Sequence, residues 1–223
     1  MIRTLLYQLN RRAPVLFAPV RAVSGTAARL VHARAIRAAL AGAGLSGTVN
    51  GLAAALRPLG RDDIEALAAF LEHEPPDRFS FFRPHGFDRP ALHRHLGAGQ
   101  FLSYGLFEDG GLVAYGLIRL TPGRTAFIGS MVAHSHGGRG IGKLMARYLY
   151  WQSARMGLDA HLTISPGNPA SLRSHSPGRT LEKIQTLDEG GYVLFRAPRM
   201  PADDHPPELV YGGARTASGA LYG

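Results

Sequence analysis

Residues 134–145, HSHGGRGIGKLM, combine four glycines with the two cations Arg139 and Lys143. An apolar run, TAFIGSMVA, precedes them, and a segment with helical periodicity, KLMARYLYWQSARM, follows. The first backbone N–H groups of a helix have no partner within the helix, and the helix dipole adds positive charge there, so such a turn binds anions, above all phosphates. Glycine lets the backbone approach the anion closely. The pattern predicts a phosphate site at residues 137–142, which we call the glycine loop.

Two common phosphate-binding motifs do not fit the glycine loop. A P-loop would run from Gly137 to Lys143 and then needs Ser or Thr, where the chain has Leu144. A dinucleotide-binding fingerprint that starts at Gly140 would need its third glycine at Met145. Both motifs also belong near the start of a parallel sheet, whereas this loop follows a predicted antiparallel meander. A tight turn without a ligand is the alternative that the residues leave open.

The segment around the glycine loop, SMVAHSHGGRGIGKLMARYLYWQSARMG, resembles the acyl-CoA binding motif of the GNAT superfamily of N-acyltransferases. The signature of that motif is Arg/Gln-x-x-Gly-x-Gly/Ala. The chain matches it from Gly137 to Gly142 except at the first position, where glycine replaces Arg or Gln. The segment HLTISPGNPASLRSH is similar to the fifth strand and following helix of the family, with Asn168 at the asparagine position. In element order the resemblance covers roughly residues 50–197.

The resemblance implies an α/β fold in which helices flank a mixed, mostly antiparallel sheet of six or seven strands, splayed between strands 4 and 5. It implies acetyl-CoA, or another short acyl-CoA, as the acyl donor, and no metal. The glycine loop would hold the pyrophosphate, the preceding strand would pair with the pantetheine arm, and the asparagine would hydrogen-bond the arm or, alternatively, cap the next helix. The expected donor-binding residues are Met131, Val132, Ala133, Gly137, Gly138, Arg139, Gly140, Ile141, Gly142, Lys143, Asn168 and Ser171.

Acyl transfer to an amine needs the amine deprotonated, the oxyanion stabilised and the leaving thiolate protonated. Relatives often carry a tyrosine acid in N-x-x-A-x-x-L-Y, and here His175 stands at the tyrosine position. We expect His175 to protonate the thiolate, with a surface histidine as the alternative. The strand TAFIGSMVA contains no acid, so we expect His134 to be the general base. His136, His161 and a water relay are alternatives.

The acceptor should contact residues 78–88, RFSFFRPHGFD, which we call the aromatic loop, because this connection lines the acceptor side in similar folds. Phe81 and Phe82 offer apolar walls, and Arg83 and His85 offer polar groups. We expect an N-acetyltransferase that acts on a primary amine of a small molecule, such as an amino sugar or an amino acid. Acetylation of a protein or peptide and a non-catalytic acyl-CoA-binding regulatory module are the alternatives.

Local patterns predict the elements that position these residues. Alternating apolar residues and turn signals indicate strands at 52–59, 125–133 and 159–165 and hairpins at 100–120 and 180–197. Helical spacing and capping residues indicate helices at 60–74, 89–96 and 143–157, and one that begins within 166–175. The Gly- and Ser-rich residues 42–51 are expected to be a linker.

The charge of the chain is concentrated at its start. Residues 1–60 hold eight arginines and no acid, whereas residues 61–223 hold 17 basic and 16 acidic residues. We therefore divide the chain into an arginine-rich extension (1–47), a GNAT domain (48–198) and a Pro/Gly-rich tail (199–223) that is either loosely ordered or packed as an extended arm.

Three interpretations of the extension stay open: a basic segment without a further role, a helix that contacts an anionic membrane, or an organellar transit peptide. Arginines interrupt every apolar run, so no membrane span is expected. Basic residues are not interleaved with stacking aromatics, so we expect no nucleic-acid partner. The chain has no cysteine, which excludes disulfides and thiolate chemistry, and we expect a cytoplasmic protein.

Overall fold

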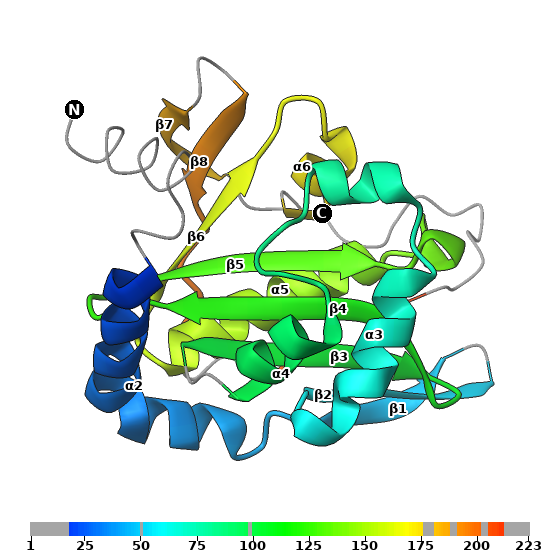
Figure 1. Cartoon of the computed structure of the whole chain (residues 1–223). Helices are drawn as coiled ribbons and strands as arrows, with labels where there is room; N and C mark the ends of the chain where they lie inside the picture. The colour runs from blue at the N-terminus through cyan, green and yellow to red at the C-terminus, as the bar shows by residue number, and fades with distance from the viewer. Residues whose placement is uncertain are drawn as a thin grey trace.

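The computed structural model describes residues 18–49, 51–97, 100–175, 181–187, 191–201 and 205–211, with residues 18–24 as backbone only. These residues form one eight-stranded sheet in the order β1-β2-β3-β4-β5-β6-β8-β7, with helices on both faces (Figure 1). Neighbouring strands run antiparallel except for β5 and β6, which are parallel. The strands are β1 Leu45–Val49, β2 Leu52–Pro58, β3 Phe101–Glu108, β4 Gly111–Leu120, β5 Thr125–Val132, β6 Asp159–Ile164, β7 Glu182–Leu187 and β8 Tyr192–Arg196. The expected mixed, mostly antiparallel α/β sheet is confirmed.

The sheet has one strand more than expected, because residues 45–49 are a strand and not a linker. β1 pairs with β2 from Leu45↔Leu56 to Val49↔Leu52. The hairpin turns at Gly51, whose φ of +80° suits glycine. β1 lies at the edge of the sheet and three of its five residues are exposed, so it needs few apolar side chains and its composition resembles that of a linker.

Helices cover the sheet on both faces (Figure 1). α5 lies along one face, α3 and α4 cover the other, and α2 packs against α5. The helices are α2 Ala18–Leu40, α3 Ile64–Glu72, α4 Arg89–Gly97, α5 Ile141–Arg155 and α6 Pro169–His175, with the short 3-10 helices η1 Arg61–Asp63, η2 Pro76–Ser80 and η3 His134–His136. The predicted helices are therefore present, and α5 begins at Ile141 within the glycine loop, with Gly140 as its N-cap.

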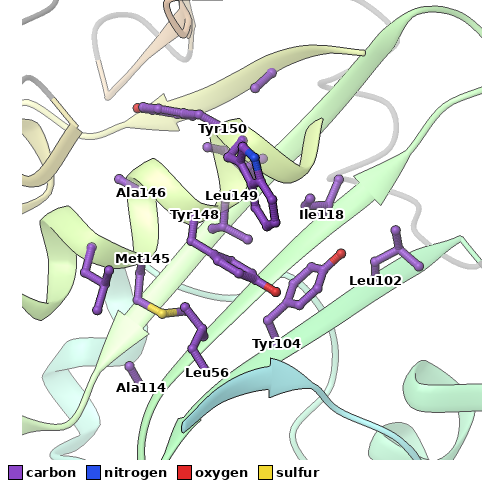
Figure 2. Close-up of a cluster of buried hydrophobic side chains, with 14 of the residues drawn as sticks. Leu56, Leu102, Tyr104, Ala114, Ile118, Met145, Ala146, Tyr148, Leu149 and Tyr150 are labelled. Atoms are coloured by element: carbon purple, nitrogen blue, oxygen red, sulfur yellow. The ribbon is translucent and has the colours of Figure 1, made fainter. Parts of the chain in front are cut away.

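The sheet separates two apolar cores. On the α5 side, Tyr104 of β3 and Tyr148 of α5 meet nearly edge to face, with ring centroids 5.1 Å apart, among buried leucines and a methionine (Figure 2). The second core lies under α3 and α4. Along β5, Ile128 belongs to the core on the α5 side and Met131 to the core under α3 and α4. Even-numbered residues of β5 therefore face α5, and odd-numbered residues face α3 and α4.

The described part of the N-terminal extension packs on the domain. Arg155, at the end of α5, donates hydrogen bonds to the carbonyl oxygens of Ala38, Ala39 and Ala41 at 2.7–2.9 Å. These bonds satisfy carbonyls at the C-terminal end of α2 that have no partner within the helix. Nε2 of His32 donates to two carbonyl oxygens of the β4–β5 turn at 3.0 and 3.1 Å. α2 is thus attached to the domain at its middle and at its end.

The outward face of α2 carries arginines and exposed apolar side chains. Leu30 and Val31 are 74% and 65% exposed, and Arg29, Arg34 and Arg37 are exposed beside them. We call these five residues the outward face. No helix in the described ranges is both long enough and apolar enough to cross a membrane. Residues 1–17 of the extension lie outside the described residues.

Part of the predicted tail packs as an extended segment. Tyr211 is buried in the core on the α5 side, and Leu209 packs against the same core. Leu209 also lies close to Gly47 of β1, where an added Cβ would be 3.7 Å from its side chain. Residues 205–211 therefore contribute to the core beside the first strands, and the tail from 212 onward lies outside the described residues.

Candidate functional site

The glycine loop connects β5 and η3 to α5 in a conformation that depends on glycine. Gly138 and Gly140 have φ values of +78° and +85°, and a Cβ added to either would meet no atom within 4 Å. Residues with side chains rarely adopt this left-handed region, whereas glycine enters it freely. The two glycines therefore determine the path of the backbone, and the loop is open to solvent on the side where their side chains would lie.

Five backbone N–H groups of this loop have no backbone partner among the described residues. They belong to Gly138, Arg139, Gly140, Ile141 and Gly142. The other two expected donors are used within the loop: the N–H of Gly137 bonds to the carbonyl oxygen of His134 at 3.2 Å, and that of Lys143 to the carbonyl oxygen of Gly140 at 3.0 Å. Free N–H groups, the N-terminus of a 15-residue helix and exposed Arg139 and Lys143 are together features that favour an anion at this loop.

A buried carboxylate, which the sequence did not point out, supports the start of the loop. Oε2 of Glu108, at the end of β3, lies 2.8 Å from Nε2 of His136 and 3.8 Å from Nη1 of Arg139. Nδ1 of His136 in turn lies 2.8 Å from Oγ of Ser135. This chain of contacts ties η3 to the sheet, and it places His136 in a structural role beside the loop.

β5 and β6 separate well before β5 reaches the glycine loop. They pair over three rungs only, Thr125↔Asp159 to Phe127↔His161, and then diverge towards their C-terminal ends (Figure 1). On the other side of β5, the N–H of Ala133 bonds to the carbonyl oxygen of Val113 at 2.8 Å. Because backbone groups alternate along a strand, the even-numbered residues of β5 direct theirs towards β6. The expected splay between these two strands is confirmed, and it leaves one edge of β5 without a neighbouring strand.

The register changes which residues can pair with an extended ligand. Of the three residues expected to do so, only Val132 directs its backbone groups at the open edge, and Ser130, which was not expected, does the same. Met131 and Ala133 direct theirs at β4, so they are not available. The sequence shows the strand but not the side on which its partner lies.

An ion pair between a buried carboxylate and a half-buried arginine holds the end of β5. Nε of Arg78 lies 2.9 Å from Oε2 of Glu74, and Nη2 of Arg78 donates to the carbonyl oxygen of Val132 at 2.6 Å. Oε1 of Glu74 accepts the N–H of His134 at 2.9 Å. The carbonyl oxygen of Val132 therefore already accepts a hydrogen bond from Arg78. The side chain of His134, the expected base, is exposed at the loop end of the strand.

α6 follows the splay and contacts the start of α5. Oδ1 of Asn168 accepts the N–H of Ser171 at 3.0 Å, so Asn168 caps α6 and retains its amide NH2 group for another partner. A Cβ added to Gly142 would lie 2.6 Å from Oγ of Ser174, so the first turn of α5 and α6 are in close contact. The cap that was an alternative for Asn168 is present.

His175, the expected acid, is buried and neutral. It is 5% exposed, and its Nδ1 lies 2.7 Å from the hydroxyl of Tyr150 on α5. Burial lowers the pKa of His175 to about 4. The neighbour of the ring is a hydroxyl group rather than an anion that would raise its pKa. The alternative of a surface histidine is wrong, and at neutral pH the imidazole carries no excess proton to donate.

The aromatic loop crosses the splay on the α3/α4 face. Phe82 lies over Gly129 of β5, where an added Cβ would be 3.1 Å from its ring. Phe81 is 45% exposed and lies near Gly167. The hydroxyl of Tyr192, on β8, donates to the carbonyl oxygen of Ser80 at 3.2 Å. The loop therefore spans from β5 to β8, with Phe81 and Phe82 placed at the open edge.

The polar residues of the aromatic loop point in different directions. Arg83 is exposed. His85 turns into the domain, where its ring stacks on that of His95 with centroids 3.7 Å apart, and its Nε2 lies 2.8 Å from the hydroxyl of Tyr115. The same hydroxyl lies 2.8 Å from Nε2 of His95. Burial lowers the pKa of both histidines, that of His95 to about 3. His85 thus anchors the loop, and its expected contact with an acceptor is not supported by this position.

A strand, a left-handed glycine loop and a helix follow one another beside a pair of parallel strands that splays apart. This is the arrangement of an acyltransferase fold. A family model described as the acetyltransferase (GNAT) family matches residues 67–176. The chain belongs to the GNAT superfamily of acetyltransferases, and as a member of that family it is an acyltransferase.

Solved structures share the fold at low sequence identity. The GNAT domain of S. lividans PAT is 16% identical, with 69% of this chain and 96% of that chain covered and a TM-score of 0.60. RimL, a ribosomal L7/L12 alpha-N-protein acetyltransferase in complex with coenzyme A, is 16% identical, with 71% and 100% covered and a TM-score of 0.52. AAC(6')-Ib in complex with ribostamycin and coenzyme A is also 16% identical, with 75% and 99% covered and a TM-score of 0.52. No curated protein matched the sequence.

Proposed function

We propose that this chain transfers an acetyl or other short acyl group from acyl-CoA to a primary amine of a small molecule. The observation that carries the proposal is the continuity of two features. The five unpartnered N–H groups of the glycine loop lie directly beyond the edge of β5 that has no strand beside it. A ligand with an anionic head and an extended, amide-bearing arm fits both, and acyl-CoA has that chemistry.

The donor would be bound mainly by backbone groups. The glycine loop would hold the pyrophosphate through its free N–H groups, with Arg139 and Lys143 adding charge. The arm would pair with Ser130 and with the N–H of Val132, and the free amide of Asn168 would complete its contacts. AAC(6')-Ib and RimL, with which the fold is shared, are solved with coenzyme A, which supports the same donor here.

The acceptor side favours a small molecule. The aromatic loop closes the splay from β5 to β8, so an extended peptide would have to displace its contacts with Gly129 and Tyr192. Phe81 and exposed Arg83 remain as an apolar and a charged contact. AAC(6')-Ib is solved with ribostamycin, which supports an amino sugar, whereas RimL acts on a protein N-terminus, which keeps a protein acceptor as the second candidate.

Release of CoA thiol tests the proposal. Acetyl-CoA should release thiol with at least one amine from a panel of amino sugars, amino acids and N-terminal peptides, and calorimetry should show CoA binding. Binding without thiol release would instead favour the non-catalytic module, which the neutral His175 and the absence of an acid in β5 support. Turnover with peptides alone would exclude the small-molecule acceptor.

A further inference from the structure

We propose that His161 is the general base that takes a proton from the acceptor amine, a role that rests on the proposed acyl transfer. His161 lies on β6 opposite Phe127, at the last rung before β5 and β6 separate. This is the closed end of the splay. A residue at that position lies beside the start of the open edge of β5, and the centroids of the rings of His161 and Phe127 are 6.1 Å apart.

His161 points to the face of the sheet on which the aromatic loop lies. Ala160, Leu162 and Ile164 of β6 belong to the core on the α5 side. Because side chains alternate along a strand, His161 projects to the opposite face, where Phe82 packs over Gly129. The base and the aromatic walls of the acceptor side therefore share one face.

The hydrogen bonding of the ring gives His161 the tautomer that a base needs. Its Nδ1 lies 3.1 Å from the carbonyl oxygen of Asp159. A carbonyl oxygen can only accept, so Nδ1 carries the hydrogen and Nε2 of the neutral ring has the free lone pair. Nε2 has no hydrogen-bond partner within the described ranges, and 8% of the residue surface is exposed. The residue is thus mostly buried, while the lone pair of Nε2 itself is accessible and has no hydrogen-bond partner in the described part of the chain.

The length of the donor brings the reacting carbon near this residue. About a dozen bonds separate the pyrophosphate of CoA from its sulfur, comparable to four or five extended residues at ~3.3 Å each. Counted back from the glycine loop along the edge of β5, the thioester falls near Gly129 or Ser130. His161, level with Phe127, is about two residues or ~7 Å farther along. An amine nitrogen, directly or through one water, bridges that distance.

The proton transfer balances with the bonds that change. Nε2 of His161 accepts one proton from the amine while the nitrogen lone pair forms a C–N bond to the thioester carbon. The C–S bond then breaks, and its electron pair leaves with sulfur. The proton passes from His161 to the thiolate through water, so the products are an amide and CoA thiol.

The other histidines are less suitable as the base. His134 is exposed at the loop end of β5, beside the place expected for the pyrophosphate. His175 is buried on the α5 side against Tyr150. His85 and His95, which hold the aromatic loop to the domain, have lowered pKa values, and their rings stack on each other. His161 alone among these five lies at the closed end of the splay.

Charged groups near His161 are paired or stacked. Arg196 is the partner of His161 on β8, and its Nη1 lies 2.8 Å from Oε2 of Glu182. Oδ1 of Asp159 lies 2.7 Å from Nη2 of Arg199. The guanidinium of Arg119 lies 5.3 Å from the ring centroid of Phe127. The charged neighbours of His161 are therefore carboxylates and guanidinium groups with partners of their own.

The test compares His161→Gln and His161→Asn with His134→Gln and His93→Gln in the full chain, using an amine that supports thiol release by the wild type. His93 is exposed on α4 and serves as the control. Both His161 variants should lower kcat by about 10²–10⁴-fold and lose the acid limb of the pH profile, with the Kd of CoA within about twofold of wild type. Two variants are used because Asn can still donate to the Asp159 carbonyl and Gln better preserves the volume.

Each other outcome overturns a defined statement. If both His161 variants keep kcat and the acid limb, or if His134→Gln loses them instead, His161 is not the base. If the wild type binds CoA but releases no thiol with any amine, the proposed acyl transfer fails and the base fails with it. An increase in the Kd of CoA for the His161 variants, without a change in kcat, would assign the residue to donor binding.

Discussion

Replacing Gly140 tests whether the left-handed backbone of the glycine loop holds the anion. Gly140 has φ +85°, and a Cβ would meet nothing within 4 Å, so Gly140→Ala adds no steric clash. It adds only the cost of placing an L-residue in the left-handed region, about 1–2 kcal/mol. If the free loop relaxes to avoid this strain, the cost appears on binding as a roughly 5–30-fold higher Kd for CoA. If the loop stays rigid, the cost of the left-handed conformation appears as a lower free energy of unfolding.

Two variants control for this interpretation. Asn tolerates the left-handed region better than Ala, so Gly140→Asn should lose less than Gly140→Ala although its side chain is larger. Gly157, after the other end of α5, has φ +70° and equally open surroundings. Gly157→Ala should therefore lower stability by a similar amount and leave CoA binding unchanged.

Calorimetry with CoA measures the change in the binding free energy of each variant, and chemical denaturation measures the change in its free energy of unfolding. The sum of the losses in stability and binding should be about 1–2 kcal/mol for Gly140→Ala. If Gly140→Ala loses neither stability nor affinity for CoA, the left-handed backbone at Gly140 does not hold the loop in the conformation that binds the phosphates. If Asn costs as much as Ala, backbone strain is not the cause.

Three further outcomes follow from burial and exposure. The pKa of His95 is about 3, so the unfolded chain binds more protons than the folded chain below pH 6.5. Stability should therefore fall as the pH drops from 6.5 towards 3, by up to about 1.4 kcal/mol per pH unit for His95, and His85, whose pKa is also lowered, should add to the fall. His95→Gln should flatten that slope in urea titrations. His175→Ala should lower the free energy of unfolding by about 1–3 kcal/mol and change kcat less than twofold, and Tyr150→Phe should do the same. A loss of kcat of about 10²-fold in a stable His175→Ala variant would instead show that His175 acts as the acid. The full chain should bind vesicles that contain phosphatidylserine through the outward face of α2, less so at high salt and less so after Leu30→Ser and Val31→Ser, and equal binding to neutral vesicles would contradict an electrostatic contact.

Local patterns were sufficient for the elements and for the glycine loop. A strand, a glycine-rich turn and a helix follow one another along the chain, so the type and spacing of neighbouring residues determine them. β1 was missed because an edge strand with exposed residues needs little apolar character, although Asn50-Gly51 is a turn signal typical of hairpins.

The parts of the site that depend on distant contacts could not be predicted. Glu74 and Arg78 bind the end of β5, and Glu108 binds His136, across more than 25 residues of chain in each case. Nothing in their local sequence indicates these partners. His175 was placed by its position in a family pattern, which gives no information on whether its side chain faces a ligand or the core.

Residues of β5 alternate between two proposed roles. Backbone groups of one set are placed for the acyl donor, and side chains of the other set are placed for the acceptor. Even-numbered positions such as Ser130 and Val132 direct their backbone groups at the open edge, and their side chains face α5. Odd-numbered positions such as Phe127 and Gly129 bond through the backbone to β4, and their side chain positions face the aromatic loop. Substitutions at the odd positions can therefore reshape the acceptor side without altering the main-chain groups proposed for the donor. Evolution, or a protein engineer, can change which amine is modified one residue at a time while the use of the same donor is inherited intact.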